Sequence, residues 1–332
     1  MREDLEMSMK RVLVTGGAGY IGSHATAELL DAGYEVIVLD NLENGYMELV
    51  DRRAKFYLGD VRNPESFEKV FAENKIDAVM HFAGYIKVGE SVSEPDKYYI
   101  NNTYGVMNVL DMMRKYSVRN IVFSSTAAVY GEVKCEGLVT EEYPTSPINP
   151  YGASKLMAER VIMDAAKAYG FNFSIFRYFN VGGAHEKHHI GQKGEGVTAL
   201  IPILLQVAKG EREQLEIYGN DYPTKDGTGI RDYIHVVDLV RAHIAALPAL
   251  EKNISGIYNL GNGNGFSVLE MLSSAREITG EKIEAVFTPR RAGDPASVVA
   301  SSQKAREILG WEPEYTDVSR IIATAWDWYK NL

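Results

Sequence analysis

The stretch TGGAGYIG, residues 15–22, decides the fold. It follows an apolar, β-branched segment at 11–16, RVLVTG, and it opens a run of helix formers that extends from Tyr20 to Ala32. Glycines at 16, 19 and 22 let the chain turn tightly, let a pyrophosphate approach the backbone, and let the helix pack close to the strand. The start of the helix offers free N–H groups and a partial positive charge to phosphates. This order of strand, glycine loop and helix predicts a dinucleotide-binding unit.

Further segments repeat the alternation of strand and helix. Strand-like segments lie at 34–40, 54–60, 78–84, 120–131 and 171–181, and a helical run at 106–115 precedes the fourth of these. Alternation of this kind predicts parallel pairing with right-handed crossovers. We therefore expect an α/β fold with a doubly wound parallel sheet of the Rossmann type.

The pattern changes after about residue 181. Residues 182–196, GGAHEKHHIGQKGEG, lack apolar periodicity and predict a long loop. Beyond it we expect helices near 198–209, 236–248, 267–278 and 302–309, and short strands near 215–218 and 257–260. We expect residues 1–10 to be a loose extension, 11–181 a cofactor domain, and 182–332 mainly a smaller mixed α/β substrate lobe. Segments such as RDYIHV (231–236) could rejoin the main sheet.

The bulk composition limits the partners. The net charge is −10 without a basic run, which argues against nucleic acid and anionic membranes as partners. No apolar segment approaches the length of a membrane span. The single cysteine, Cys135, excludes an internal disulfide and fits a cytoplasmic protein, and we expect a passive loop residue.

An acidic residue ends the second strand-like segment. Asp40 at this place can bind both hydroxyls of an adenosine ribose and would repel a 2′-phosphate, so it favours NAD over NADP. Asp60, after the third strand, could hydrogen-bond adenine, and a simple loop cap is an equal alternative.

The stretch NPYGASK (149–155) places a tyrosine and a lysine four residues apart. Tyr151 and Lys155 then share one helix face, and an ammonium beside a phenol favours the phenolate. A phenol with a lowered pKa could act as a general base in alcohol oxidation. Such pairs also recur by chance, so the interpretation depends on the glycine loop and the sheet pattern.

These motifs together resemble the extended short-chain dehydrogenase/reductases, and among them the UDP-glucose 4-epimerase family. The segments that carry the resemblance span residue 11 to the C-terminus: TGGAGYIGSH, LDNL, HFAG, VGESV, FSSTAAVYG, NPYGASK, RYFNVGGAH, IYGNDYPTKDGTGIRDYIHV, YNLGNGNGFSV and PRRAGDPA. The first and the sixth alone indicate only the superfamily.

The resemblance implies roles for individual residues. Tyr151 would be the general base, Lys155 would lower its pKa, and Thr126 would bond the 4-hydroxyl of the sugar. The residues implied to hold NAD are Gly16, Gly19, Tyr20, Ile21, Gly22, Asp40, Asn41, Asn44, Asp60, Val61, Phe82, Ala83, Gly84, Asn101, Ser124, Tyr151, Lys155 and Tyr178. Those implied to bind the nucleotide sugar are Thr126, Tyr151, Asn180, Leu200, Tyr218, Arg231, Arg291, Asp294 and Val298.

The implied reaction interconverts UDP-glucose and UDP-galactose. Tyr151 takes the 4-hydroxyl proton while C4 gives hydride to NAD, and the 4-keto sugar turns over before the hydride returns. NAD is regenerated in each cycle and is expected to stay tightly bound. The resemblance also implies a homodimer, formed by helices near 90–116 and 151–169.

Three positions depart from the family pattern. The family often has a lysine two residues after HFAG, where this chain has Ile86 followed by Lys87. Ala199 stands where an asparagine is common. Val298 replaces an aromatic residue that limits the space around C2 of the sugar in some members, so we hypothesise that N-acetylated UDP-hexosamines are also accepted.

Alternative functions remain open at this point. A nucleotide-sugar 4,6-dehydratase shares the fold and the Tyr/Lys pair, but it needs an acid and a base directly after the threonine, where this chain has Ala127 and Ala128. A non-catalytic NAD-binding regulator would usually lack Tyr151 or Lys155. A zinc site in HEKHHI (185–190) lacks a partner cluster in the sequence, so we expect no metal.

Overall fold

The core of the molecule is a seven-stranded parallel sheet in the order β10-β6-β5-β4-β1-β2-β3. The computed structural model describes residues 9–134, 137–194, 198–291 and 294–332, so most of the expected N-terminal extension and Cys135 lie outside the described residues. The strands are β1 (Arg11–Thr15), β2 (Glu35–Asp40), β3 (Lys55–Leu58), β4 (Ala78–His81), β5 (Asn120–Thr126), β6 (Asn172–Tyr178) and β10 (Gly256–Leu260). This order confirms the predicted doubly wound sheet, whose strand order reverses between β1 and β4.

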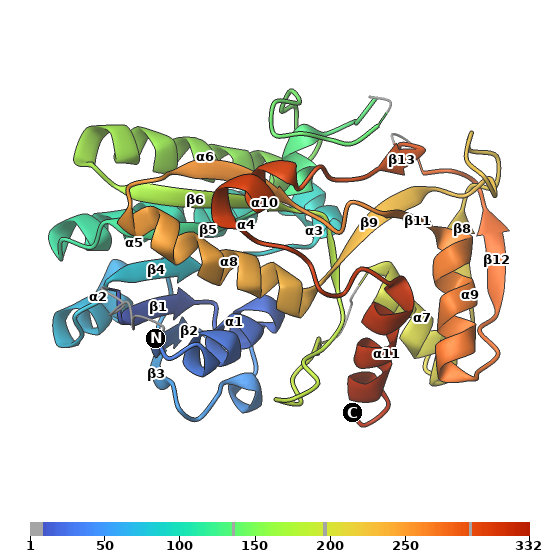
Figure 1. Cartoon of the computed structure of the whole chain (residues 1–332), viewed down its shortest axis with the longest axis horizontal. Coiled ribbons are helices and arrows are strands. Elements are labelled where there is room, and N and C mark those ends of the chain that lie inside the picture. The colour runs from blue at the N-terminus through green and yellow to red at the C-terminus, as the bar shows by residue number, and fades with distance from the viewer. Residues whose placement is uncertain (1–8, 135–136, 195–197, 292–293) are drawn as a thin grey trace, which may run out of the picture.

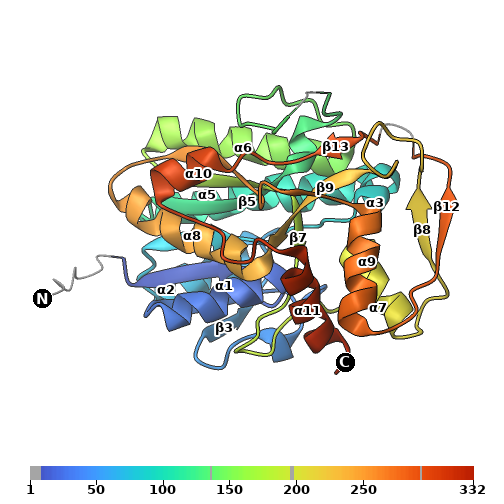
Figure 2. The same cartoon turned by 45° about the vertical axis from the view of Figure 1, so that its right-hand side comes forward.

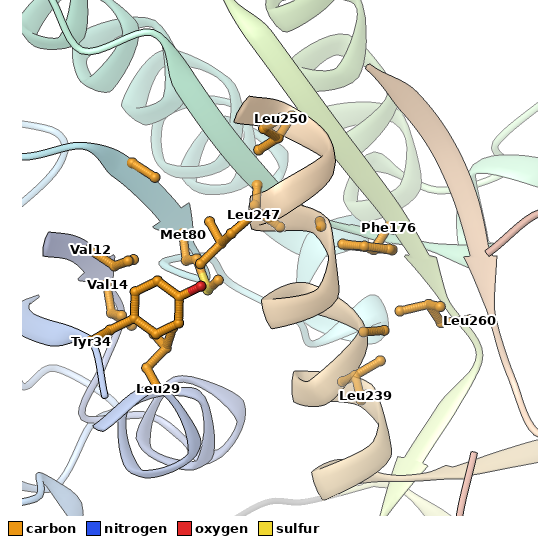
Figure 3. Packing of buried hydrophobic residues seen from close by; sticks show 14 of the residues in the cluster. Val12, Val14, Leu29, Tyr34, Met80, Phe176, Leu239, Leu247, Leu250 and Leu260 are labelled. Carbon is orange, nitrogen blue, oxygen red and sulfur yellow. The ribbon is translucent and has the colours of Figure 1, made fainter. Parts of the chain in front are cut away.

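Helices cover both faces of the sheet (Figure 1). One face is packed by α2 (Pro64–Glu73), α5 (Gly105–Lys115) and α6 (Pro150–Tyr169). The other face is packed by α1 (Tyr20–Asp31), α8 (Val236–Glu251) and α10 (Gln303–Leu309). Figure 3 shows how apolar side chains of α1 and α8 meet those of the sheet.

Between β4 and α6 the chain contains several short helical segments. They are α3 (Val88–Ser93), α4 (Pro95–Tyr98), a π-helical stretch η2 (Tyr99–Tyr104) that runs into α5, and a 3₁₀ turn η3 (Ala127–Tyr130) directly after β5. A further 3₁₀ turn, η1 (Met47–Leu49), follows β2.

The start of α6 is fixed by its own sequence. The Asn149 side chain accepts a hydrogen bond from the Gly152 N–H (2.8 Å), and Pro150 suits the first helical position. A Cβ on Gly152 would lie 2.6 Å from the Ala128 carbonyl oxygen, so only glycine allows this close approach of α6 to η3. The contact brings the first turn of α6 against the end of β5.

The second lobe stands beside the carboxyl ends of the sheet strands (Figure 2). One small sheet pairs β9 (Ile230–His235) with β7 (Asn180–Gly182), β11 (Gly265–Ser267) and β13 (Ser297–Val298), and β8 (Leu215–Tyr218) pairs with β12 (Ala285–Thr288). The lobe's helices are α7 (Leu200–Ala208), α9 (Val268–Thr279) and α11 (Val318–Tyr329).

The segment that rejoins the main sheet is β10, together with α8 and α10, whereas most of RDYIHV forms β9 of the small sheet. The apolar side chains of α8 explain this placement, since Leu239, Leu247 and Leu250 are buried against the sheet. No helix in the described parts of the chain is long and apolar enough to span a membrane.

Shortening a core side chain of α8 tests this packing. Leu247→Ala should lower the free energy of unfolding by about 2–5 kcal/mol, because a buried leucine leaves a cavity that the sheet and helix close only in part. Leu58→Ala is the matched control, since this leucine is exposed and its loss should change stability by about 0.5 kcal/mol at most. Urea unfolding followed by circular dichroism measures both, and equal effects would contradict the assigned core.

Candidate active site

The glycine loop between β1 and α1 leaves no room for side chains. Gly16 has a φ of +72°, and a Cβ there would lie 2.6 Å from the Ala83 backbone nitrogen. A Cβ on Gly22 would lie 2.1 Å from the Gly16 carbonyl oxygen. No side chain caps the start of α1, so its first N–H groups can serve an anion.

A cavity opens at the carboxyl ends of β1, β2, β3 and β4, beside this loop. Eleven residues predicted from the sequence line it: Gly16, Gly19, Asp40, Asn41, Asn44, Asp60, Val61, Phe82, Ala83, Gly84 and Asn101. Sequence reasoning missed five others: Leu39, Glu43, Gly45, Gly59 and Tyr85. The missed residues are neighbours of predicted ones, so counting outward from each strand end would have found them.

Asp40 joins the loops after β1 and β2. Its carboxylate accepts hydrogen bonds from the Ala18 N–H (2.9 Å) and the Leu42 N–H (2.8 Å). Burial raises the pKa of Asp40, and these hydrogen bonds act in the opposite direction. The carboxylate therefore holds the glycine loop in place and also lines the cavity.

Asp60 is engaged by neighbouring side chains. Its carboxylate pairs with Arg62 (2.5 Å) and accepts a hydrogen bond from the Asn41 amide (3.1 Å). Arg62 holds the pKa of Asp60 low, at about 2, so that this rim of the cavity is ionised at neutral pH.

Tyr151 lies in the first turn of α6, close enough to Thr126 at the end of β5 for the threonine hydroxyl to influence the phenol. Burial raises the pKa of the Tyr151 phenol, and the Thr126 hydroxyl partly offsets this. The sequence predicted a lowered pKa for the Tyr151 phenol. The protein groups alone do not produce one, because the effect of burial is larger than the opposite effect of Thr126. Tyr151 and Lys155 do lie one turn apart near the start of α6, as their spacing predicted.

Lys155 follows one turn later and is only 2% exposed. Its Nζ donates to the Ser124 carbonyl oxygen (2.9 Å), and a side chain on Gly84 would begin 3.0 Å from it. Lys155 therefore reaches the wall of the cavity. Burial lowers the pKa of Lys155 to about 8, and the Glu159 carboxylate acts against this shift.

A buried ion pair supports this helix face. Glu159 forms a salt bridge with Arg177 of β6 (2.7 Å) and is hydrogen-bonded by the Ser125 hydroxyl. Arg177 also donates to the Tyr130 hydroxyl (3.0 Å). Sequence reasoning missed this network, although Glu159 stands four residues after Lys155 on the same face.

Two other predicted cofactor residues, Tyr178 and Tyr20, are not among the residues that line this cavity. The Tyr178 hydroxyl forms a hydrogen bond with His243 Nε2 (2.5 Å) in the buried face of the sheet. Tyr20 donates to the Gly183 carbonyl oxygen (2.6 Å), which ties α1 to the loop after β7. Ile21 and Gly22 continue the first turn of α1, where Ile21 packs against the core.

The predicted substrate residues fall into two groups in the second lobe. Arg231 pairs with Asp294 (2.5 Å), and Val298 lies opposite Arg231 in the register of β13 and β9. The nearby Asn180 side chain donates to the Asp232 carbonyl oxygen (2.8 Å).

In the other group, the Arg291 guanidinium lies 3.7 Å from the ring centre of Tyr218. Leu200 is the first residue of α7 and packs against the core of the lobe.

The histidine loop after β7 is held by carboxylates. His185 pairs with Glu28 (2.9 Å) and His188 with Asp31 (2.9 Å), both on α1. Within the described residues no group of three or more His, Cys, Asp or Glu side chains could hold a metal ion. These histidines thus attach the loop to the helix.

Comparison with known proteins agrees with this geometry. Residues 12–261 match the model of the NAD dependent epimerase/dehydratase family. The chain is 51% identical to the UDP-glucose 4-epimerase of Lacticaseibacillus casei over 321 residues, which cover 96% of this chain and 97% of that protein.

Two solved structures share the whole architecture. The UDP-glucose 4-epimerase of Bifidobacterium longum in complex with NAD+ and UDP is 43% identical, with a TM-score of 0.90 over 97% of this chain and 98% of that one. The UDP-Glc/GlcNAc 4-epimerase of Campylobacter jejuni is 42% identical, with a TM-score of 0.87 over 97% of this chain and all (100%) of that one. The chain therefore belongs to the NAD-dependent epimerase/dehydratase family, with UDP-glucose 4-epimerases among its full-length relatives.

Proposed function

We propose that this protein is an isomerase that interconverts UDP-glucose and UDP-galactose at C4, with NAD as its resident cofactor. The observation that carries the proposal is the closeness of Tyr151 to Thr126, together with Lys155, which reaches the wall of the dinucleotide cavity. The close relatives, which match this chain end to end, support the same reaction.

The cavity fits NAD. Its glycine cradle leaves space for a pyrophosphate but not for side chains, and Asp40 and Asp60 suit the hydroxyl and amino groups of an adenosine. When bound, NAD supplies the oxidising power that removes a hydride from C4 and the reducing power that returns it.

Tyr151 and Thr126 handle the proton of the 4-hydroxyl. The Thr126 hydroxyl can donate and accept, so it can link the sugar hydroxyl to the phenol of Tyr151. Tyr151 takes the proton as the alcohol becomes a ketone and gives it back when the ketone is reduced. Lys155, one turn away on the same helix face, stabilises the phenolate by its charge.

The second lobe would anchor the nucleotide. Forked guanidinium groups match phosphate oxygens, and this lobe contributes Arg231 from β9 and Arg291 from the segment after β12. We assign Asp294 and Asn180 to the same UDP-sugar. Because UDP carries the binding contacts, the sugar can rotate in the site while UDP stays bound. Either face of C4 can then meet the cofactor.

The residues after Thr126 argue against dehydration. Elimination across C5 and C6 needs an acid and a base, yet Ala127 and Ala128 form the 3₁₀ turn at this place. Because neither methyl side chain can transfer a proton, epimerisation is the reaction that these groups support.

Purified protein supplied with UDP-galactose and no added NAD should form UDP-glucose until a constant ratio is reached, as followed by the anomeric proton signals in NMR. Tyr151→Phe should lower kcat by roughly 10²–10⁴-fold, because the general base is lost. Thr126→Ala should lower it by roughly 10–100-fold, the value of one hydrogen bond to a developing charge.

Tyr116→Phe is the control, because this hydroxyl donates to Glu68 (3.0 Å) at the end of α5 and neither residue lines the cavity. Unchanged turnover in Tyr151→Phe would contradict the assigned base. A 4-keto-6-deoxy product would point to the dehydratase alternative.

We also propose that N-acetylated UDP-hexosamines are substrates. Val298 is a short side chain on β13 opposite Arg231, and it leaves more room than an aromatic residue would. The wild-type protein should convert UDP-N-acetylgalactosamine, and Val298→Tyr should lose this activity while keeping that on UDP-galactose. Failure of the wild-type protein with the N-acetylated sugar, alongside fast turnover of UDP-galactose, would contradict the proposal.

The apolar surface of the first-half helices supports a homodimer. Ile100, Tyr104 and Met107 lie on one face of the continuous η2–α5 helix and are 51%, 47% and 46% exposed, and Met157 on the adjacent α6 is 49% exposed. Exposed apolar side chains grouped in this way are typical of interaction surfaces. The single cysteine is in keeping with a reducing compartment, and we propose that the dimer works in the cytoplasm.

The double substitution Ile100→Lys with Met107→Lys should convert the dimer into a monomer, because two lysines from each protomer would bury four charges at a symmetric interface. Light scattering after size-exclusion chromatography measures the mass. Ile308→Lys, an exposed position on α10, is the control and should remain dimeric. A wild-type protein that is monomeric at micromolar concentration would contradict the assigned interface.

A further inference from the structure

Three loops, which follow β2, β3 and β4, meet at the rim of the dinucleotide cavity. Glu43 follows β2, Arg62 follows β3 and Tyr85 follows β4, and two of them, Glu43 and Tyr85, line the cavity. None of the three was predicted from the sequence, and the proton chemistry at Tyr151 does not use them.

A single phenol hydroxyl connects the three loops. The Tyr85 hydroxyl donates to Glu43 Oε1 (2.5 Å) and accepts from Arg62 Nη1 (2.9 Å). Arg62 Nη2 closes the ring of contacts by donating to Glu43 Oε2 (2.9 Å). We call this triad of Glu43, Arg62 and Tyr85 the rim clasp.

The rim clasp is built on fixed parts. The Tyr85 backbone is held on both sides by the buried Asn102 side chain, which accepts from its N–H (2.9 Å) and donates to its carbonyl oxygen (3.0 Å). Lys97 lies over the Tyr85 ring, 4.7 Å from its centre. Burial, reinforced by the contact with Glu43, raises the pKa of Tyr85 to about 12, so the hydroxyl keeps its proton at neutral pH.

The residue after Tyr85 cannot form a polar contact with a ligand through its side chain. Ile86, which directly follows Tyr85, is 66% exposed and has no hydrogen-bond donor in its side chain. The side chain of Ile86 therefore adds no polar contact beside the rim clasp.

We propose that the rim clasp retains the cofactor, so that NAD cannot leave its cavity without separation of the loops after β2, β3 and β4. This inference rests on the proposed function, because an epimerase must keep the same cofactor through both half-reactions. Tyr85 is in this view a positioning residue that acts through Glu43 and Arg62.

Tyr85→Phe is the sharpest test, because it removes both hydrogen bonds of the hydroxyl and keeps the ring, its packing and the contact with Lys97. Purified holoenzyme is mixed with isotope-labelled NAD, and exchange into the protein is followed by mass spectrometry of the released cofactor. Losing two hydrogen bonds to charged groups should speed exchange by roughly 10–100-fold.

Tyr57→Phe is the matched control. Tyr57 lies in β3, and its hydroxyl donates to Glu73 (2.8 Å) at an exposed position outside the cavity. Removing this hydroxyl should leave the exchange of NAD unchanged. Glu43→Gln is a second variant at an exposed position; it weakens the pair with Arg62 and should speed exchange to a smaller extent. Excess free NAD should restore the turnover of Tyr85→Phe to the wild-type value.

The outcomes are separable. Exchange in a folded Tyr85→Phe protein at the wild-type rate would overturn the rim clasp and leave the epimerase assignment intact. A wild-type protein with no epimerase activity even in added NAD would overturn the proposed function, and with it the retention role that rests on it.

Discussion

The site depends on one close approach, that of the first turn of α6 to the end of β5. Gly152 permits it, because a Cβ would lie 2.6 Å from the Ala128 carbonyl oxygen, and Asn149 fixes the helix start that presents Tyr151. Thr126 ends a buried strand and therefore has little freedom to move away. A proton donor and acceptor are thus held together by backbone geometry, which costs no reorganisation when the substrate reacts.

The buried ammonium group of Lys155 needs a nearby negative charge to stay protonated. Lys155 is buried one turn after Tyr151, and burial lowers its pKa to about 8. The Glu159 carboxylate on the same helix face acts against this shift, and Arg177 holds Glu159 in place at 2.7 Å. Because the ion pair is fully desolvated, removing one partner alone would leave an uncompensated buried charge.

Sequence reasoning was most successful for residues that directly follow a strand, because the strand pattern itself places them at the site. The glycine loop, Asp40 and residues 82–84 of HFAG could be predicted to share one cavity, because each follows a strand of a parallel sheet. Glu43 and Tyr85 could not, since only their meeting in space with Arg62 gives them a role. The pKa of the Tyr151 phenol is raised in the protein without cofactor, and the sequence could not show this, because the i, i+4 pattern conveys the nearby charge but not the depth of burial. Likewise β10 joins the main sheet because α8, which precedes it, packs against that sheet. The hydrophobic pattern within each segment does not specify this long-range packing.

The central claim is that the hydrogen at C4 leaves and returns without meeting solvent. The most direct test is to convert UDP-galactose to UDP-glucose in heavy water, with no added NAD, and to measure the isotope at C4 of the product by NMR. The account predicts that C4 keeps its original protium through many turnovers, because bound NAD takes this hydrogen and gives it back. Deuterium at C4 of the product would contradict the account, since it would require a route in which this hydrogen exchanges as a proton.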